Sequence, residues 1–413
     1  MPIAEPTASA SRNGAFQLPF LTVEEISNLA PSLANPFEPR KSGLSINHII
    51  GCPLECSYCV RHKDNNFQMK KPRAMMTDEA VVAALLEHPF FIRDLTPLQI
   101  FNKATDGFVP SVKPHLFRTL ELLDHAKLKN DVLIITRYRV SEEDCDFLNR
   151  LENIRITLLV TYSGIEDDKI EPISNAIPIQ SLKTAYASAD RYKVIHYWRP
   201  IVPGLNDSEA QIDFALGELS AHAHATVFSG LFYGDKVRAY FKENGLPELA
   251  PATARRKIIP ELVERRILER RMGTQSQERL FRKTSCAVAF VHGRADYNGH
   301  YGIINQGTRE ICEICPSDQF ERCKSRHRTP TEDEVRRAVE KIGYGDLRFR
   351  IEEGKAIVVE HMDKESVRYF LQHLFAFQFH DESYPHKPQR HGRADIGWEG
   401  TSPVPATNWL IEG

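Results

Sequence analysis

The sequence predicts an α/β protein: a partial (β/α)6 TIM-like barrel, followed by a C-terminal cysteine-cluster segment and a small α+β unit. The main observation is that six short runs rich in Ile, Val and Leu alternate with amphipathic segments, which is typical of βα units and a parallel sheet. Most of these runs are apolar almost throughout, as expected for strands that are covered on both faces. Because βα connections share one hand, six units in series predict a curved, incomplete barrel.

Each element of the barrel has its own signal in the sequence. The six predicted strands cover residues 44–50, 98–103, 131–137, 154–163, 192–202 and 225–232. Two of the helices between them show a single apolar face, formed by Leu116, Leu120 and Leu123 and by Ile212, Leu216 and Leu219. Three hydroxyl residues occupy N-cap positions: Thr77, Ser141 and Ser208.

The chain divides into five predicted regions. Residues 1–40 form an N-terminal extension, 41–250 the barrel, 251–330 a basic helix and an auxiliary metal-cluster segment, 331–380 a small α+β unit, and 381–413 an irregular tail. In the small unit, residues 331–342 and 364–377 are predicted helices, and residues 347–360 a hairpin that turns at Glu353-Gly354. We expect His386 and His391 in the tail to be surface residues.

The basic helix has two readings, a nucleic-acid contact or a solvated amphipathic helix. Its cations are Arg255, Arg256, Lys257, Arg265, Arg266, Arg270 and Arg271. Because Ile, Leu and Glu residues are interleaved with these cations, the amphipathic helix is favoured.

Composition indicates an ordinary globular protein. With 413 residues, of which 42% are hydrophobic, the chain can bury a large core. The formal net charge of -2 gives no overall attraction to nucleic acid or to anionic membranes. Residues 1–13 lack the pattern of a signal peptide, and no run of about 18 apolar residues predicts a membrane span. We therefore expect a cytoplasmic protein with reduced cysteines and no membrane partner.

Three cysteines follow the first predicted strand in the pattern C-x3-C-x2-C, at Cys52, Cys56 and Cys59. A 4Fe-4S cluster normally takes four cysteine ligands, so three thiolates leave one iron open to another ligand. Zinc with His62 as the fourth ligand is the alternative, although Cys59-x2-His62 makes a cramped loop for zinc. The loop leaves the carboxyl end of a predicted parallel strand, which is where the sites of such folds lie.

With Tyr58 directly before the third cysteine, this motif resembles the signature of the radical S-adenosylmethionine (radical SAM) superfamily. The resemblance implies a partial barrel and an S-adenosylmethionine whose amine and carboxylate chelate the open iron of a 4Fe-4S cluster. It also implies reductive cleavage of this cofactor to methionine and a 5′-deoxyadenosyl radical, which abstracts hydrogen from a substrate. Cys52, Cys56 and Cys59 are then the catalytic ligands, and the electron is expected from a donor such as flavodoxin or ferredoxin.

The same resemblance assigns seven residues to the cofactor: Tyr58, Thr105, Asp106, Arg137, Thr161, Ser163 and Arg199. The tyrosine is expected to stack on the adenine, and the two residues of the second strand end are expected near the methionine amine. Arg137 is the first choice for binding the cofactor carboxylate, and Arg199 is the second. The two hydroxyls of the fourth strand are expected at the ribose. Hydrogen bonds between strand ends are the structural alternative for these polar residues.

Four more cysteines form the pattern C-x25-C-x2-C-x7-C: Cys286, Cys312, Cys315 and Cys323. Four ligands complete a closed site, which fits a second 4Fe-4S cluster or a tetrahedral structural zinc. Iron-sulfur is favoured because many radical SAM enzymes add an auxiliary cluster after the barrel. A metal clip that only holds the segment together is the structural alternative. Cys145 has no partner at metal spacing and is expected to be a buried thiol.

Several segments within residues 36–232 look like the spore photoproduct lyase-like branch: Thr105-Asp106, residues 135–137, residues 160–163 with Glu171-Pro172, and residues 199–207. Spore photoproduct lyase repairs a thymine dimer in DNA with a hydrogen-donating cysteine before the acid of the second strand end. The matching stretch here, residues 103–106, has no cysteine. A small-molecule biosynthetic intermediate or a peptide is therefore ranked above a nucleic-acid lesion or base as the substrate. The rival of another class is a non-catalytic metal-binding module that binds RNA or DNA through its arginine helix.

Overall fold

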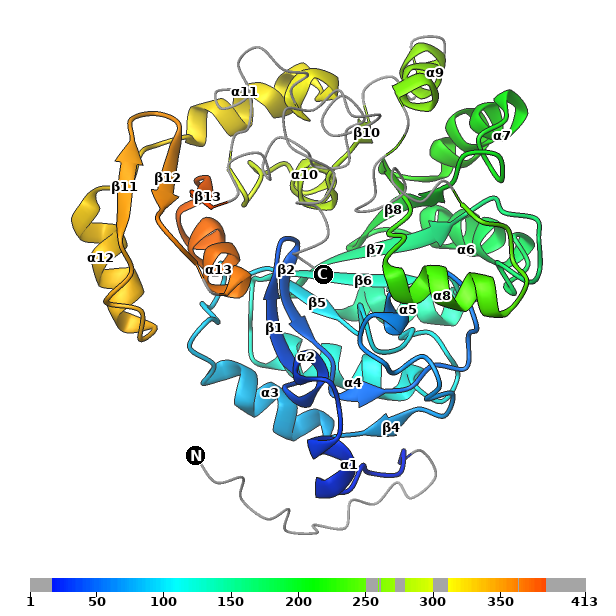
Figure 1. Cartoon of the computed structure of the whole chain (residues 1–413), viewed down its shortest axis with the longest axis horizontal. Helices are drawn as coiled ribbons and strands as arrows, with labels where there is room; N and C mark the ends of the chain where they lie inside the picture. Colours follow the sequence, from blue (N-terminus) through cyan, green and yellow to red (C-terminus); the bar gives the residue numbers. More distant parts are fainter. Residues whose placement is uncertain are drawn as a thin grey trace.

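The computed structural model of the chain describes residues 17–249, 259, 261–271, 279–299, 311–362 and 364–383. Its main feature is an eight-stranded sheet with the order β1-β2-β5-β6-β7-β8-β9-β10 (Figure 1). All neighbouring strands in it are parallel except β1, which is antiparallel to β2. The strands are β1 Phe37–Arg40, β2 Gly43–Ile46, β5 Leu98–Ile100, β6 Asp131–Thr136, β7 Arg155–Tyr162, β8 Lys193–Ile201, β9 Ala225–Gly230 and β10 Leu280–Phe281. The predicted fold class is confirmed.

The six predicted strands occur in the predicted order, and five of them lie within their predicted ranges. The first prediction is wrong in one respect, because residues 44–50 do not form one continuous strand. β2 stays in the main sheet, whereas β3 Ile49–Ile50 pairs antiparallel with β4 Arg73–Ala74 in a separate two-stranded sheet. The short strands β1 and β10 at the two edges of the main sheet were not predicted. Their few residues show no pattern of their own.

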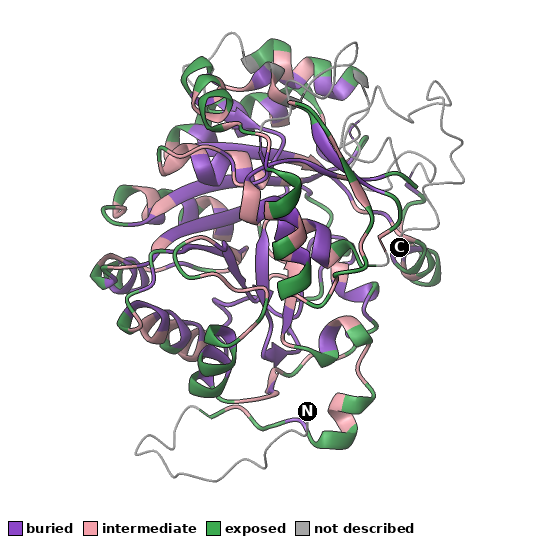
Figure 2. Cartoon of the chain, turned by 90° about the vertical axis from the view of Figure 1, so that its left-hand side faces the viewer, coloured by how far each residue is buried: buried purple, intermediate pink, exposed green. Residues whose placement is uncertain are grey.

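The two faces of the sheet belong to two hydrophobic clusters. Side chains of successive strand residues point to opposite faces, so Val132 and Ile134 pack with the helices of the larger cluster, whereas Leu133 and Leu159 pack with α10. Figure 2 shows the buried strands running through the centre of the molecule, with exposed residues on the outer sides of the helices. The helices are α1 Val23–Ser27, α2 Pro31–Ala34, α3 Asp78–Leu86, α4 Lys113–His125, α5 Glu142–Arg150, α6 Ala176–Ala187, α7 Glu209–Asp213, α8 Asp235–Glu243, α9 Glu261–Arg271, α10 Thr284–Val291, α11 Ser317–Arg326, α12 Glu332–Lys341 and α13 Glu365–Phe375.

The predicted helix caps are confirmed. Thr77 accepts a hydrogen bond from the backbone N–H of Ala80, and Ser141 forms a capping box with Asp144. Ser208 caps α7, but the helix that follows is not a regular α-helix throughout, since Phe214–Leu219 is a π-helix. The predicted apolar face formed by Leu116, Leu120 and Leu123 is fully buried.

The small C-terminal unit has the predicted helices and hairpin. β11 Phe349–Glu352 and β12 Ala356–Val359 pair antiparallel around Gly354, whose positive φ of 67° suits glycine. A third strand, β13 Phe379–Asp381, pairs parallel with β12 and was not predicted. Helix α13 packs against β1, so this unit lies beside the open edge of the main sheet (Figure 1).

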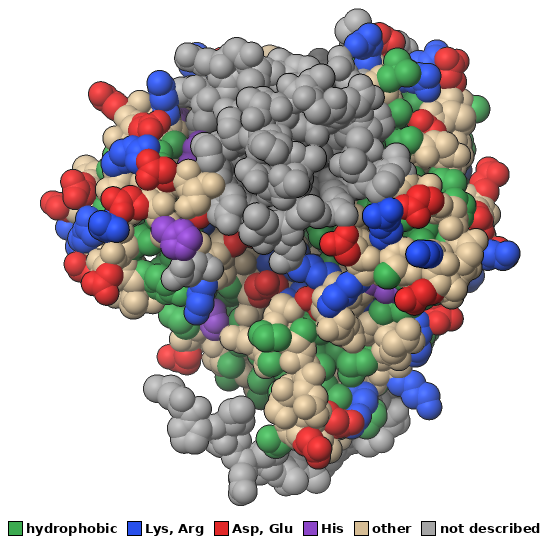
Figure 3. Space-filling model, in the orientation of Figure 1, with side chains coloured by type: hydrophobic (Ala, Val, Ile, Leu, Met, Phe, Trp, Pro, Cys, Tyr) green, Lys and Arg blue, Asp and Glu red, His purple; other side chains and the backbone are tan. Residues whose placement is uncertain are grey.

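The basic segment contains a described helix, α9, whose Val263 and Ile267 are buried. Arg270 pairs with Glu209 at 3.1 Å and with Asp213 at 3.2 Å, which ties α9 to α7. These contacts agree with the amphipathic reading. On the face seen in Figure 3, acidic and basic side chains are interspersed.

Five residues of the predicted basic helix and tail lie outside the described residues: Arg255, Arg256, Lys257, His386 and His391. In the part of the chain that the structure describes, no helix is long and apolar enough to cross a membrane.

Candidate active site

One pocket lies where the cysteine loop meets the carboxyl ends of β5, β6, β7 and β8. Of the seven predicted cofactor residues, all except Ser163 line this pocket together with the three cysteines. The hydroxyl of Ser163 instead accepts a hydrogen bond from the backbone N–H of Ile165 at 3.2 Å. The lining residues are Cys52, Leu54, Cys56, Tyr58, Cys59, Val60, Arg61, Phe101, Asn102, Lys103, Thr105, Asp106, Ile135, Thr136, Arg137, Thr161 and Arg199.

The cysteine loop begins at a glycine that no other residue replaces without strain. Gly51 has a φ of 106°, and a Cβ there would lie 2.4 Å from the carbonyl oxygen of Lys71. This close approach lets the loop fold back on itself, so that the N–H of Cys52 donates to the carbonyl of Met69 at 2.9 Å. A backbone N–H of Cys59 donates to Cys56 at 3.0 Å, which makes the turn between the last two cysteines.

Burial perturbs two thiols of the cysteine loop. Burial raises the pKa of the Cys52 thiol, with the charge of Arg61 opposing the rise, and burial also raises the pKa of the Cys56 thiol. Thiols in such surroundings stay protonated until a metal displaces the proton. Thiolates are soft ligands that suit iron-sulfur clusters.

The geometry also bears on the zinc alternative. Within the described residues, no group of three or more His, Cys, Asp or Glu side chains is arranged to hold a metal ion, at either group of cysteines. The ring of His62, the proposed fourth zinc ligand, is stacked on Phe67 with 3.8 Å between the ring centroids.

A buried network holds Tyr58 in the pocket wall. The Tyr58 hydroxyl donates to Oε2 of Glu171, and Nη1 of Arg137 donates both to the Tyr58 hydroxyl and, at 2.7 Å, to Oε2 of Glu171. The side chains of Arg137 and Glu171 are 18% and 4% exposed. The segment around Glu171 is itself attached to the cysteine loop, since the Ser57 hydroxyl donates to the carbonyl of Lys169 at 2.6 Å. Arg137 therefore already has a carboxylate partner, and its binding of the cofactor carboxylate stays a prediction.

Asp106 ties two strand ends together. Its Oδ1 accepts from the hydroxyl of Thr136 at 2.7 Å and from the N–H of Phe108 at 2.9 Å, and its Oδ2 accepts from the N–H of Arg137 at 2.9 Å. Burial raises the pKa of this carboxyl, and the three donors oppose the rise. The neighbouring Thr105 hydroxyl is buried and has no partner among the described residues, so it is free to bond a ligand in the pocket.

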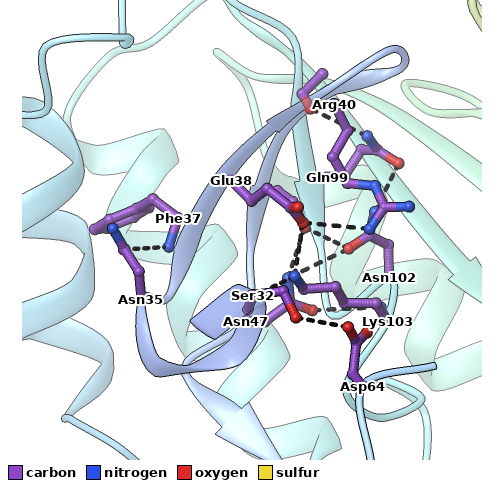
Figure 4. Close-up of polar contacts among 12 residues, drawn as sticks. Ser32, Asn35, Phe37, Glu38, Arg40, Asn47, Asp64, Gln99, Asn102 and Lys103 are labelled. Atoms are coloured by element: carbon purple, nitrogen blue, oxygen red, sulfur yellow. Dashed lines mark hydrogen bonds and ion pairs between the residues drawn. The ribbon is translucent and has the colours of Figure 1, made fainter. Parts of the chain in front are cut away.

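Lys103 extends this wall toward the N-terminal segment, as Figure 4 shows. Its ammonium donates to Oε2 of Glu38 at 2.6 Å and to the carbonyl of Ser32. The Ser32 hydroxyl in turn donates to Asp64 at 2.6 Å, which connects α2 with the later part of the cysteine loop. Burial lowers the pKa of Lys103, and Glu38 opposes the decrease. The lysine that stands in the cysteine-free stretch before Asp106 is thus an ion-paired part of the pocket wall.

Arg199 enters the pocket from β8. Its Nη1 donates to the hydroxyl of Tyr197 at 2.9 Å, and its guanidinium lies 4.9 Å from the centroid of that ring. The Tyr197 hydroxyl also lies 3.1 Å from the hydroxyl of Thr284, the first residue of α10. Among the described residues, no carboxylate pairs with Arg199. It is therefore better placed than Arg137 to take up a negative charge from a ligand.

The second group of cysteines gathers around α10 and α11. Electrostatic interactions connect Cys286 with Cys312 and Cys315, and Cys315 with Cys323. Burial raises the pKa of all three of the thiols for which a shift is resolved, those of Cys286, Cys315 and Cys323. Asp296 stands at the centre of the group: it accepts from the thiol of Cys286 at 3.5 Å, and its N–H donates to the sulfur of Cys323 at 3.3 Å.

Three residues of the site were missed as functional candidates in the sequence: Glu171, Lys103 and Arg61. The first lies 113 positions from its partner Tyr58, and nothing in the local pattern connects them. Lys103 and Arg61 each stand within a few residues of predicted site residues, and that proximity was the available signal.

No family model matches the chain, and no curated protein matches it either. Similarity is found to solved structures. A spore photoproduct lyase variant with bound AdoMet and dinucleoside spore photoproduct is 13% identical, with a TM-score of 0.38 over 75% of this chain and 77% of that chain. Another variant of the same lyase is 13% identical, with a TM-score of 0.39 over 82% and 87%. Streptococcus suis SuiB bound to the precursor peptide SuiA is 12% identical, with a TM-score of 0.35 over 55% and 44%.

At these identities and TM-scores the similarities carry no argument about function.

Proposed function

We propose that the protein is a radical SAM enzyme, with a 4Fe-4S cluster on Cys52, Cys56 and Cys59 and S-adenosylmethionine in the pocket beside it. The observation that carries this proposal is the pocket itself. It joins the three thiols and Tyr58 of the cysteine loop to polar residues from different strand ends, Thr105, Asp106, Arg137, Thr161 and Arg199. Carboxyl ends of parallel strands are where such folds build their sites.

The bound cofactors supply electron transfer to S-adenosylmethionine and a 5′-deoxyadenosyl radical that abstracts hydrogen from an organic substrate. The chain's own residues bind and orient the reactants. Thr105 offers an unpartnered hydroxyl for the methionine amine, and Arg199 a cation for the carboxylate. Tyr58 is held by Glu171 and Arg137, so that its ring forms a fixed wall for the adenine. Several lining residues are buried, among them Cys52, Cys56, Thr105 and Asp106, and their burial would limit the access of water to the reacting atoms.

A second 4Fe-4S cluster on Cys286, Cys312, Cys315 and Cys323 belongs to this proposal, with structural zinc as the alternative. Its support is the mutual proximity of the thiols and the N–H of Asp296, which donates to Cys323. Hydrogen bonds from N–H groups to cluster sulfurs help to set a cluster's potential.

For the substrate we propose a small molecule or a peptide. The stretch from Lys103 to Asp106 carries no cysteine, and Lys103 is engaged with Glu38, so the hydrogen-donating thiol of the DNA-repair reaction has no counterpart at that position. Nucleic-acid repair or base modification by the same radical chemistry is the second candidate. The electron donor is proposed to be a flavodoxin or ferredoxin.

The test is anaerobic reconstitution of the full chain with iron and sulfide, followed by reduction in the presence of S-adenosylmethionine. We expect about four irons for the barrel cluster, a cubane EPR signal, and 5′-deoxyadenosine. The C56A variant is expected to lose the product. C145A is the matched control, because Cys145 is an equally buried thiol outside both cysteine groups.

The non-catalytic rival predicts a different result. A chain that retains zinc instead of iron, forms no 5′-deoxyadenosine and binds RNA or DNA would support a metal-binding module and contradict the enzyme. Product formation that survives in C56A would contradict the ligand assignment alone.

A further inference from the structure

Arg61 is a buried cation inside the cysteine loop. It is only 2% exposed, and it stands two residues after Cys59 in the 3-10 helix Val60–His62. Its guanidinium donates to five backbone carbonyls of the loop: those of Cys52 at 2.9 Å, Leu54 at 3.4 Å, Asn66 at 2.9 Å, Phe67 at 2.7 Å and Met69 at 2.8 Å. One side chain thus holds both ends of the segment that carries the three thiols.

These bonds explain how an irregular loop is folded around the pocket. Buried carbonyl groups need donors, and a loop without regular secondary structure cannot supply all of them from its own backbone. Arginine suits this task because its planar guanidinium presents several donors in fixed directions. Lysine has one ammonium group on a flexible stem and cannot reach carbonyls on both sides of the loop at once.

Arg61 carries its charge without an acidic partner among the described residues. Among the described side chains, no Asp or Glu carboxylate forms an ion pair with it, and its Nε is buried with no partner. An unpaired charge in the interior is costly, so the protein is expected to provide an anion close by. Arg61 lines the same pocket as the three cysteines, whose thiols would become thiolates when iron binds.

We infer that Arg61 is a positioning residue that folds the cysteine loop before metal arrives and then supplies the counter-charge of the thiolates. This inference rests on the proposed function, because it assumes an iron-sulfur centre at Cys52, Cys56 and Cys59. The two parts of the role are separable. R61K keeps the charge and loses the array of hydrogen bonds, whereas R61Q loses both.

The first experiment measures retention of the barrel cluster against a chelator, using the part of the reduced EPR signal that S-adenosylmethionine perturbs. Partners that orient metal ligands typically contribute about 10- to 100-fold to metal affinity, and we expect a loss of that size in both variants. R282K is the matched control, since Arg282 is also buried but pairs with Glu264 outside the loop. It is expected to retain the cluster as the unaltered chain does.

The second measurement is the reduction potential of the cluster that remains. Loss of a nearby positive charge disfavours the reduced, more negative cluster, so R61Q is expected to show an about tenfold lower ratio of reduced to oxidised cluster at a fixed potential, or about 59 mV. R61K should stay close to the unaltered chain. If Arg61 only shaped the loop, R61K and R61Q would have the same reduction potential. Equal retention and equal potential in R61Q and the unaltered chain would overturn the inference.

A third measurement does not depend on whether the variants fold. In the metal-free, unaltered chain, hydrogen exchange is expected to show protected amides at Cys52, Asn66 and Met69, whose N–H groups are bonded within the preformed loop. Exchange of these amides at the rate of an unfolded segment would contradict the claim that the loop is folded before metal. Absence of iron from the reconstituted, unaltered chain would refute the proposed function instead, which is a distinguishable outcome.

Discussion

Replacement of Glu171 by Gln tests whether the network around Tyr58 is a buried ion pair or a surface contact. Glu171 accepts from Arg137 at 2.7 Å and from the Tyr58 hydroxyl, and it is 4% exposed. Removal of one partner of a fully buried pair costs about 3–5 kcal/mol because the other charge is left without compensation. Gln keeps an acceptor and Arg137 is 18% exposed, so we expect a loss near the value of one hydrogen bond to a charged group, about 2–3 kcal/mol.

The assay is urea denaturation of the metal-free chain, read as the change in the free energy of its first unfolding transition. E334Q is the matched control, because Glu334 pairs with Arg328 at the same 2.7 Å but with side chains that are 29% and 61% exposed. An exposed pair contributes at most about 1 kcal/mol. If the two substitutions destabilised the chain equally, the assignment of Glu171 as a buried anchor of the pocket wall would be refuted.

Three further predictions concern the loop, the pH dependence and the cofactor. G51A places a Cβ 2.4 Å from the carbonyl oxygen of Lys71 at a φ of 106°. It should therefore lower the free energy of unfolding by about 1–3 kcal/mol or more and reduce iron uptake. Iron uptake equal to that of the unaltered chain would count against this close approach. Burial lowers the pKa of His196 to about 3, so the unfolded chain binds a proton that the folded chain refuses between this value and about 6.5. The free energy of unfolding therefore rises with pH across that window. Between pH 6.5 and pH 5 this histidine should lower the free energy of unfolding by about 2 kcal/mol, and H196Q should remove that decrease, as measured by denaturation at both pH values. R199Q should weaken S-adenosylmethionine binding about tenfold in isothermal titration and leave 5′-methylthioadenosine binding unchanged, since that molecule lacks the carboxylate; equal weakening of both would place Arg199 elsewhere in the pocket.

Local signals in the sequence were sufficient for most of the barrel. The apolar runs that became β5 to β9 are covered on both faces, and the caps at Thr77 and Ser141 bond within their own helices, so each signal lies within a few residues of its consequence. The pairing of β3 with β4 could not be predicted in this way. It depends on a loop that returns after more than twenty positions, and two-residue strands have no periodicity.

In the candidate site, too, features with a local sequence signal were predicted, and contacts between distant residues were not. The cysteine spacing and the strand-end positions indicated most of the residues that line the pocket, because parallel strands bring their carboxyl ends to one edge. What these residues bond to was not predictable. Arg137 is engaged by Glu171, Asp106 by Thr136 and two backbone N–H groups, and Arg61 by five carbonyls, and each of these contacts depends on how the chain folds in three dimensions.

In the proposed enzyme, three protein sulfurs hold a cluster with one iron open to S-adenosylmethionine. The most direct measurement is the EPR spectrum of the reduced, reconstituted chain with and without S-adenosylmethionine, recorded in parallel for C56A. We expect a cubane signal whose shape changes when S-adenosylmethionine is added, and no such change in C56A. A spectrum that is identical with and without the cofactor, or a change that persists in C56A, would contradict it.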